Sequence, residues 1–482
     1  MLYNSLGRKK QRLKPIEGKN VRMYSCGITA YYTPHMGNMR RYLGDDIIKR
    51  VMMHNGYAVK HVENVTDVGH LVSDADTGDD KLRLAAEHEH KSMREMADFY
   101  AKLFFDGCAL LNILNPDIIC KASEHVNEMI ALLEKLDGKG FLYKAENGIY
   151  FDTSKFKGYG KLTGLTFKQL NAQLREGARV EIVKGKRHAT DFAVWRFAPP
   201  QQTEMVWESR WGRGFPGWHL ECSAMSMKYL GNHFDVHTGG IDHLQIHHPN
   251  EIAQSEASTG EKFVNHWTHH NFLLVNNRKM SKSAGTLYTL QYVIEKGHSP
   301  MAIRLFLISG HYRQSLNFTF EALSNAENTL NGIYSFLGRL SNAANKAAND
   351  DTASFIKSVR SLKREFFARL NDDIGMPEAL AAMHSLIGIA NARPNLNRRE
   401  ARAVAKAMLG MDAVLGLRFG EHYSKGNARL GREEKALLKE REEARRAGDF
   451  KRSDEIRVLL MERHKIVVED TKEGQTWRKA SR

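Results

Sequence analysis

Cysteine is scarce in this chain, which has only four among its 482 residues, at Cys26, Cys108, Cys120 and Cys222. Four thiols spread this widely are too few for the disulfide framework of a small secreted domain. The opening residues, Met1 to Ser5, contain no charged leader followed by an apolar run, so we predict no export signal. A reducing, cytoplasmic location fits this pattern best.

Long apolar runs are also missing. No stretch approaches the roughly 20 apolar residues that a bilayer-spanning helix needs, which excludes a membrane-embedded protein. Basic residues outnumber acidic ones, 71 against 56, and the formal net charge is +15. A polyanion is the natural partner of such a chain, nucleic acid before a membrane surface. Charge alone leaves open a protein that is simply basic.

Two short strings carry more specific chemistry. The first, HMGN, begins at His35, after a predicted strand over Val21 to Cys26 and before a predicted helix that starts near Met39. Gly37 leaves room for a nucleotide against the backbone, and the side chains of His35 and Asn38 offer donors where a helix N-terminus already favours anions. By itself such a string is more often a plain turn.

The second string, KMSKS, spans Lys279 to Ser283 and places the ammonium groups of Lys279 and Lys282 in a turn-like segment before Gly285. Activating a carboxylate with ATP needs no general base, because the carboxylate is already ionised. The barrier lies in bringing two anions together and in the charge on the phosphoryl oxygens. Hydrogen-bond donors and cations lower both contributions to this barrier. Alone, this string is more often a solvated basic loop.

Four possible metal ligands accompany the strings. Cys26 ends the first predicted strand, Cys222 follows the segment GFPGWHLE, and His247 and Glu251 are four positions apart on one face of a predicted helix. Two thiolates, an imidazole and a carboxylate form a zinc-type ligand set. The residues alone leave another interpretation open, a surface His–Glu pair and two cysteines buried as small hydrophobic residues.

The order and spacing of the two strings resemble the signature motifs of class I aminoacyl-tRNA synthetases. Over nearly its whole length the chain is similar to the cysteinyl-tRNA synthetase family, through CGITAY from Cys26 with HMGN, NVTDV from Asn64, GWHLECSAM from Gly217, HHPNE from His247 and the lysine loop. The resemblance implies a ligase that uses ATP with Mg²⁺ to form cysteinyl-adenylate and then transfers the cysteinyl group to the 3' end of tRNA(Cys).

The resemblance also implies a zinc site. In that family the positions of Cys26, Cys222, His247 and Glu251 hold one zinc ion at the floor of the amino-acid pocket, where the substrate thiolate joins it. Pockets that recognise only shape separate near-isosteres such as serine and cysteine by about 10- to 200-fold. Zinc binds thiolate sulfur far better than a neutral hydroxyl, so no editing domain is needed.

Further roles follow from motif positions. The resemblance implies catalytic roles for His35, Asn38, Lys279 and Lys282, with Lys282 stabilising the transition state, and ATP contacts from His35, Gly37, Asn38 and Lys282. It implies a cysteine pocket that includes Thr66, Trp218, His237 in a histidine cluster, and Asp242 as the acceptor of the substrate ammonium group. Core packing is the alternative for Trp218, and a turn hydroxyl for Thr66. We assign no role to His243, His248, His269 and His270.

The chain departs from the commoner family pattern in three places. Residues 69–78 form an acidic, glycine-containing insertion before the DDK string at 79–81, Ile28 replaces a usual proline, and Asn38 stands where many class I enzymes have a second histidine. The insertion resembles a known variant branch of the family. It puts in doubt the local contacts around Thr66.

We predict an α/β fold, a Rossmann-like doubly wound parallel sheet with an inserted connective domain, followed by a helical bundle and a small C-terminal module. The expected divisions are the first half of the catalytic domain at 1–120, the insertion at 121–200, the second half at 201–275, the lysine-loop segment at 276–317, the bundle at 318–429 and an anticodon-reading module at 430–482.

The C-terminal residues 430–482 distinguish between the remaining functional alternatives. Trp477 beside Arg478 suits stacking on an unpaired base, so we expect both to contact tRNA. Relatives that couple cysteine to an amino sugar, as in mycothiol biosynthesis, share the adenylate chemistry but lack this module. A silent paralogue that binds RNA or senses cysteine is a third interpretation, against which the intact lysine loop argues. We expect a monomer.

Overall fold

A computed structural model describes residues 1–68, 92–176, 183–280, 285–343, 351–393, 396–426, 431–464, 466–471 and 474–479. The predicted insertion at 69–78, the DDK string at 79–81 and the residues Lys282 and Ser283 lie outside these ranges. The chain divides into two compact units. The first comprises Met1–Pro300, Phe306–Phe320 and Leu370–Met376, and the second comprises Met301–Leu305, Glu321–Arg369 and Pro377–Arg482.

The first unit is built on a five-stranded parallel sheet in the order β11-β10-β3-β4-β5. Its strands are β3 (Asn20–Thr29), β4 (Ala58–Thr66), β5 (Ile118–Lys121), β10 (Phe234–Gly240) and β11 (Val264–His270). The chain adds β4 and β5 on one side of β3, and later adds β10 and β11 on the other. The winding therefore reverses between β3 and β10, and the predicted doubly wound fold is confirmed.

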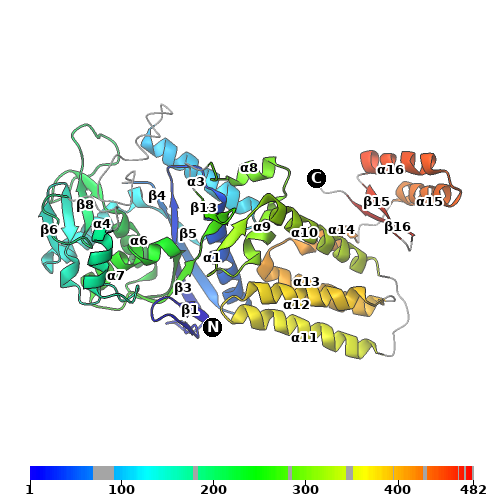
Figure 1. Ribbon diagram of the computed structural model, residues 1–482, viewed down its shortest axis with the longest axis horizontal. Helices are drawn as coiled ribbons and strands as arrows, with labels where there is room; N and C mark the ends of the chain where they lie inside the picture. The colour runs from blue at the N-terminus through cyan, green and yellow to red at the C-terminus, as the bar shows by residue number, and fades with distance from the viewer. Residues whose placement is uncertain are drawn as a thin grey trace. The chain divides into compact units, whose positions relative to one another are not determined.

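Helices cover both faces of this sheet, with α1 on one side of the strands and α6 on the other (Figure 1). The helices of this part are α1 (Met36–His54), α3 (Met93–Leu110), α4 (Val126–Gly138), α6 (Trp218–Leu230) and α7 (His247–Thr259), with the short turns η1 (Ala122–Glu124) and η3 (Ile241–Leu244). Six of the ten residues of β3 are buried, as expected of a central parallel strand.

Smaller sheets flank the central one. The insertion contributes an antiparallel sheet of β6 (Leu142–Ala145), β7 (Gly148–Phe151), β8 (Phe192–Phe197) and β9 (Gly214–Pro216), with η2 (Thr153–Lys155) and α5 (Phe167–Glu176). Strand β9 lies beyond residue 200, where we expected the catalytic domain to resume. A hairpin of β1 (Leu2–Asn4) and β2 (Lys9–Gln11) begins the chain.

The segment after β11 forms a three-stranded sheet of β12 (Leu273–Val275), β13 (Arg278–Lys279) and β14 (Leu316–Phe318), with α8 (Leu290–Glu295) and α9 (Pro300–Ser309). Most of the second unit is helical, as predicted: α10 (Phe320–Ser341), α11 (Thr352–Asn371), α12 (Met376–Asn391), α13 (Arg398–Leu415), α14 (Phe419–Gly426), α15 (Arg432–Arg446) and α16 (Phe450–His464). None of the described helices is long and apolar enough to cross a membrane.

The chain closes with a hairpin of β15 (Ile466–Thr471) and β16 (Gly474–Lys479) against which α15 and α16 pack. Their shared core contains Leu438, Ile456, Leu460, Ile466 and Val468. Arg441 is fully buried and forms paired hydrogen bonds to Asp470. This ion pair, buried on its arginine side, holds α15 to the hairpin.

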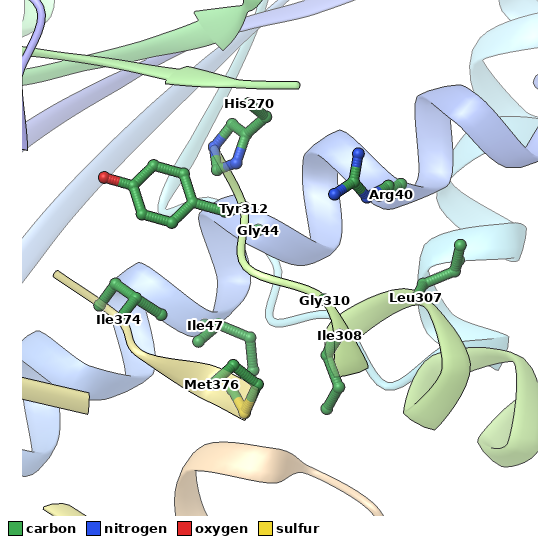
Figure 2. A pocket seen from close by; sticks show the side chains of 10 residues that line it. All are labelled: Arg40, Gly44, Ile47, His270, Leu307, Ile308, Gly310, Tyr312, Ile374 and Met376. Atoms are coloured by element: carbon green, nitrogen blue, oxygen red, sulfur yellow. The ribbon is translucent and has the colours of Figure 1, made fainter. Parts of the chain in front are cut away.

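One face of α1 lines a pocket together with residues near positions 310 and 375 (Figure 2). Its lining is Arg40, Gly44, Ile47, His270, Leu307, Ile308, Gly310, Tyr312, Ile374 and Met376. Here Nε2 of the His270 imidazole lies 2.8 Å from Asp45 Oδ1, within hydrogen-bond distance, and the ring packs closely against Gly44. A Cβ on Gly44 would come within 2.3 Å of His270 Nδ1.

Gly44→Ala should therefore destabilise the protein, although alanine favours a helix interior by about 1 kcal/mol. The clash with a buried side chain costs about 1 to 3 kcal/mol, as overpacking does elsewhere. Gly332→Ala in α10 is the matched control, because nothing lies within 4 Å of the added Cβ. Thermal melting should show a lowered melting temperature for Gly44→Ala and an unchanged or raised one for Gly332→Ala. Equal melting temperatures would contradict the proposed packing.

Candidate active site and metal centre

The predicted site residues gather where the winding of the sheet reverses, at the carboxyl ends of β3, β4 and β10. In open α/β sheets ligands bind at this position, because neighbouring connections leave in opposite directions. After β3 the chain passes close to β4, where the N–H of Ala30 donates to the carbonyl of Thr66 at 3.0 Å. It then turns into α1 through residues 31–35.

The HMGN string forms the N-terminus of α1, as predicted. His35 is the N-cap residue, and its Nδ1 accepts from the N–H groups of Gly37 at 3.1 Å and Asn38 at 3.3 Å. In return the Asn38 Oδ1 accepts from the His35 N–H at 3.0 Å. Burial lowers the pKa of His35 to about 4, so the ring is neutral at pH 7. With Nδ1 as acceptor, Nε2 carries the hydrogen and remains a donor.

The second string approaches the first. Lys279 lies on β13 opposite Leu274, with its ammonium 4.4 Å from the centre of the Phe272 ring. The sulfur of Met280 lies 3.4 Å from the position that a Cβ on Gly37 would occupy. Beyond the segment that is not described, the Tyr288 carbonyl accepts from the N–H of Met36 at 2.9 Å. The structure thus brings the two strings together, and Lys282 lies outside the described residues.

The four predicted metal ligands also converge. Cys26, Cys222, His247 and Glu251 are all buried, and one ligand atom from each lies within 4.8 Å of every other. The two sulfurs are 3.9 Å apart, Cys26 Sγ is 3.8 Å from Glu251 Oε1, and His247 Nε2 is 3.0 Å from the same oxygen. These residues come from β3, α6 and α7, which meet only in the folded chain.

The charges of this cluster are set by its own members. Burial would raise the pKa of Glu251, but His237 and His247 outweigh burial and lower it to about 2. Burial would likewise raise the pKa of Cys222, but the hydrogen bond with Cys26 lowers it to about 6. Burial and the neighbouring Cys222 hold the pKa of Cys26 well above its usual range. One thiol and the carboxyl are therefore ready to act as anionic ligands.

A second quartet, which the sequence did not reveal, overlaps the first. It consists of Cys26, His237, His248 and Glu251. His237 Nε2 lies 2.8 Å from Glu251 Oε2, and His248 Nε2 lies 3.3 Å from Cys26 Sγ. Contacts of this kind fix the orientation of metal ligands.

The histidine chain continues away from the quartets. His248 Nδ1 meets His269 Nε2 at 2.8 Å, and His269 Nδ1 meets Ser5 Oγ at 2.7 Å. We assigned no role to His248 and His269 from the sequence, because His269 reaches this position only through the pairing of β11 with β10, whereas His248 lies on α7. The pairing of two adjacent histidines in both β11 and α7 was the one available signal.

A third group of possible ligands lies in the insertion and consists of Asp152, His188 and Asp191. Its carboxylates already have protein partners. Asp191 accepts from Tyr143 and from the backbone and hydroxyl of Thr153. Asp152 pairs with Arg187 at 2.9 Å. These bonds explain the group without an ion.

The predicted pocket residues come from four different elements, and Trp218 and His237 contact members of the first quartet. The Trp218 ring lies against His247, with ring centres 4.3 Å apart. Thr66 ends β4, and its hydroxyl accepts from Asn64 Nδ2 at 2.8 Å. Asp242 is exposed on η3, just after β10. His237 is fully buried and contacts Glu251, so it lies behind the quartet.

The two residues predicted to contact tRNA lie on β16 in the second unit. Trp477 pairs with Val468 on β15 and packs partly buried against the core of the C-terminal module. Its ring therefore has one side in the core. Arg478 pairs with Val467 in the same hairpin.

Comparison with known families agrees with this arrangement. Residues 12–328 match the family described as tRNA synthetases class I (C) catalytic domain, residues 365–420 match the DALR domain, and residues 427–478 match the cysteinyl-tRNA ligase anticodon binding domain. Among solved structures, methionyl-tRNA synthetase from Mycobacterium tuberculosis with methionyl-adenylate has a TM-score of 0.63 at 14% identity, over 85% of this chain and 94% of that one. That likeness is one of fold.

Relatives similar over the full length carry the name cysteine–tRNA ligase. The protein from Treponema denticola is 40% identical over 99% of both chains, and one from Thermus thermophilus is 40% identical over 99% of both. A third, from Burkholderia lata, is 41% identical over 98% of this chain and 96% of its own length. The chain belongs to the cysteinyl-tRNA synthetase family of class I aminoacyl-tRNA synthetases.

Proposed function

We propose that this chain is a cysteine–tRNA ligase whose selectivity for cysteine comes from a zinc ion held by Cys26, Cys222, His247 and Glu251. It activates cysteine with ATP and transfers the cysteinyl group to tRNA(Cys). The observation that carries this proposal is the convergence of two buried thiols, an imidazole and a carboxylate at the sheet position where the two ATP-type strings also meet.

The donor set fits zinc in chemistry and in spacing. Tetrahedral zinc with Zn–S bonds of about 2.3 Å places two sulfurs about 3.8 Å apart, and the two cysteine sulfurs are 3.9 Å apart. His247 Nε2 has no hydrogen-bond partner among the described residues, although Glu251 Oε1 is only 3.0 Å away. This geometry is expected when two ligand atoms both point to one shared metal position and not toward each other. His219 meets the other ring nitrogen of His247 at 2.8 Å and orients it.

The bound ion would supply a soft Lewis acid that prefers a thiolate to a neutral hydroxyl. The protein's own residues then orient the amino acid. Asp242 accepts the substrate ammonium group, and Trp218 and Thr66 form walls of the pocket. His237 fixes the Glu251 carboxylate through its 2.8 Å contact. The fully buried ligand set excludes water from the sulfur end of the substrate.

The nucleotide end uses donors and cations. His35 Nε2–H, Asn38 Nδ2–H and the N-terminus of α1 face the phosphates, and Gly37 keeps the backbone open. Lys279 and Lys282 neutralise the triphosphate, which enters with Mg²⁺, and Lys282 stabilises the charge that gathers on the α-phosphate in the transition state. The substrate carboxylate attacks without a base, since it is already ionised.

The acceptor is tRNA, and residues 427–478 support this choice over an amino sugar because they match an anticodon-binding module. Trp477 and Arg478 contact the anticodon in this proposal. We also infer a monomeric, cytoplasmic enzyme. The free state of all four cysteines supports a reducing compartment.

The metal assignment is tested by Cys222→Ser. Purified wild-type protein should contain about one zinc per chain, as a single structural-type site does, and the variant should lose most of it, because a hydroxyl is a poor zinc ligand. Elemental analysis after gel filtration measures the ratio. Cys108→Ser, which replaces a buried cysteine outside the cluster, should keep its zinc. Full zinc content in Cys222→Ser would rule out this ligand set.

The role of Lys282 is tested by Lys282→Ala. Cysteine-dependent ATP–pyrophosphate exchange should fall by about 10²- to 10³-fold, the usual cost of removing one group that stabilises transition-state charge. The melting temperature should stay the same. Lys296→Ala, a nearby lysine outside the string, should leave the exchange rate unchanged. Normal exchange by Lys282→Ala would refute the assigned role.

The tRNA contact is tested by replacing Trp477 with leucine and with phenylalanine. Leucine keeps the apolar contact with the module core but removes aromatic stacking, which is worth about 1 to 3 kcal/mol per base. The KM for tRNA in aminoacylation should rise at least about five-fold with leucine and change little with phenylalanine. ATP–pyrophosphate exchange, which needs no tRNA, should be unchanged in both. Identical tRNA KM values in all three proteins would show that Trp477 is only a core residue.

A further inference from the structure

Tyr32 lies in the turn between β3 and α1, three residues before His35, and belongs to none of the assigned roles. Its ring stacks nearly parallel on the His35 imidazole, with ring centres 5.9 Å apart and planes inclined by 22°. Its hydroxyl oxygen accepts from Asn38 Nδ2 at 3.4 Å. One side chain thus contacts both residues that offer side-chain donors at the N-terminus of α1.

These contacts complete the constraints on the two donors. The capping bonds hold His35 Nδ1 and Asn38 Oδ1 against the backbone. These capping bonds do not fix the plane of the His35 imidazole, which a stacked ring can fix. They also do not fix the Asn38 amide nitrogen, which needs a hydrogen-bond partner. Tyr32 supplies both. Its phenol also stays protonated, because burial, with Tyr31 as the next cause, raises the pKa of Tyr32 to about 12.

Tyr32 is also within electrostatic range of the proposed amino-acid end of the site. The negative charge of Asp242, proposed to receive the cysteine ammonium group, is among the charges that Tyr32 senses. Its ring and hydroxyl contact the residues whose donors are proposed to face the nucleotide. The residue is partly buried and not an exposed loop side chain, as a group that lines a cleft should be.

We propose that Tyr32 is a positioning residue for ATP, whose ring and hydroxyl hold His35 and Asn38 with their donor atoms toward the phosphates. This inference rests on the roles proposed above for His35 and Asn38, and it adds a residue that those roles do not include. The hydroxyl acts through the Asn38 amide, and the ring acts through the His35 imidazole.

Tyr32→Phe and Tyr32→Leu separate these two contributions. Phenylalanine keeps the stack and removes one neutral hydrogen bond, so the KM for ATP in exchange should rise roughly three- to ten-fold. Leucine also removes the stack, so kcat should fall by about a further ten-fold. The KM for cysteine should change less than about two-fold in the phenylalanine variant. Tyr229→Phe is the matched control, because it removes a 2.7 Å phenol bond to His125 and should leave both constants unchanged.

A double-mutant cycle decides whether the hydroxyl acts through Asn38. Tyr32→Phe should raise the ATP KM in the wild-type background and have no further effect in Asn38→Ala. An equal rise in both backgrounds would overturn the inference. An unchanged ATP KM in Tyr32→Phe, with a raised one in Asn38→Ala, would overturn it and leave the proposed role of Asn38 intact. Unchanged constants in both Asn38→Ala and His35→Ala would refute the proposed function at these residues, and the inference with it.

Discussion

The reversal of winding between β3 and β10 is the constraint on which the rest of this site depends. The two strands are neighbours in the sheet, yet the connections that follow them leave toward opposite edges. A crevice at their carboxyl ends is unavoidable in this topology. Cys26 comes from β3, and His237 from β10. The turn after β3 also carries Tyr32 and His35. The proposed metal site and the proposed nucleotide site therefore both depend on the end of one strand.

The burial of charge explains the histidine cluster. A carboxylate as fully buried as that of Glu251 is costly unless partners compensate its charge. His237 and His247 each contact one of its oxygens, at 2.8 and 3.0 Å, and together they hold its pKa at about 2. The histidines therefore stabilise the carboxylate in the ionised form that a metal ligand needs.

The sequence predicted a candidate metal-ligand set that the structure brings together, but it did not predict the contacts that support this set. Two thiols and a His–Glu pair at helical spacing made Cys26, Cys222, His247 and Glu251 one possible ligand set, the family resemblance favoured it, and the structure brings the four residues together. His248 and His269 are not visible, since their contacts depend on strand order. The sequence did not indicate a role for Tyr32, for a related reason. Its contacts with His35 and Asn38 arise from the path of the turn, which residue types alone do not fix. The boundary predicted at residue 200 places β9 outside the insertion, because a three-residue strand carries almost no periodic signal.

In the proposed function, selectivity for cysteine follows from where the candidate ligand set lies, and not only from its composition. Serine and cysteine have nearly the same shape, so a pocket of apolar walls would separate them by about 10- to 200-fold at most. An ion at the floor of the crevice changes the comparison from size to ligand chemistry. That discrimination holds only if water cannot compete for the ion. All four candidate ligands are buried, and the Trp218 ring packs on one of them, His247. In the proposed function, the same crevice also carries the nucleotide donors, at the next turn of chain, so an amino acid selected by the proposed ion would lie beside the phosphate that its carboxylate attacks.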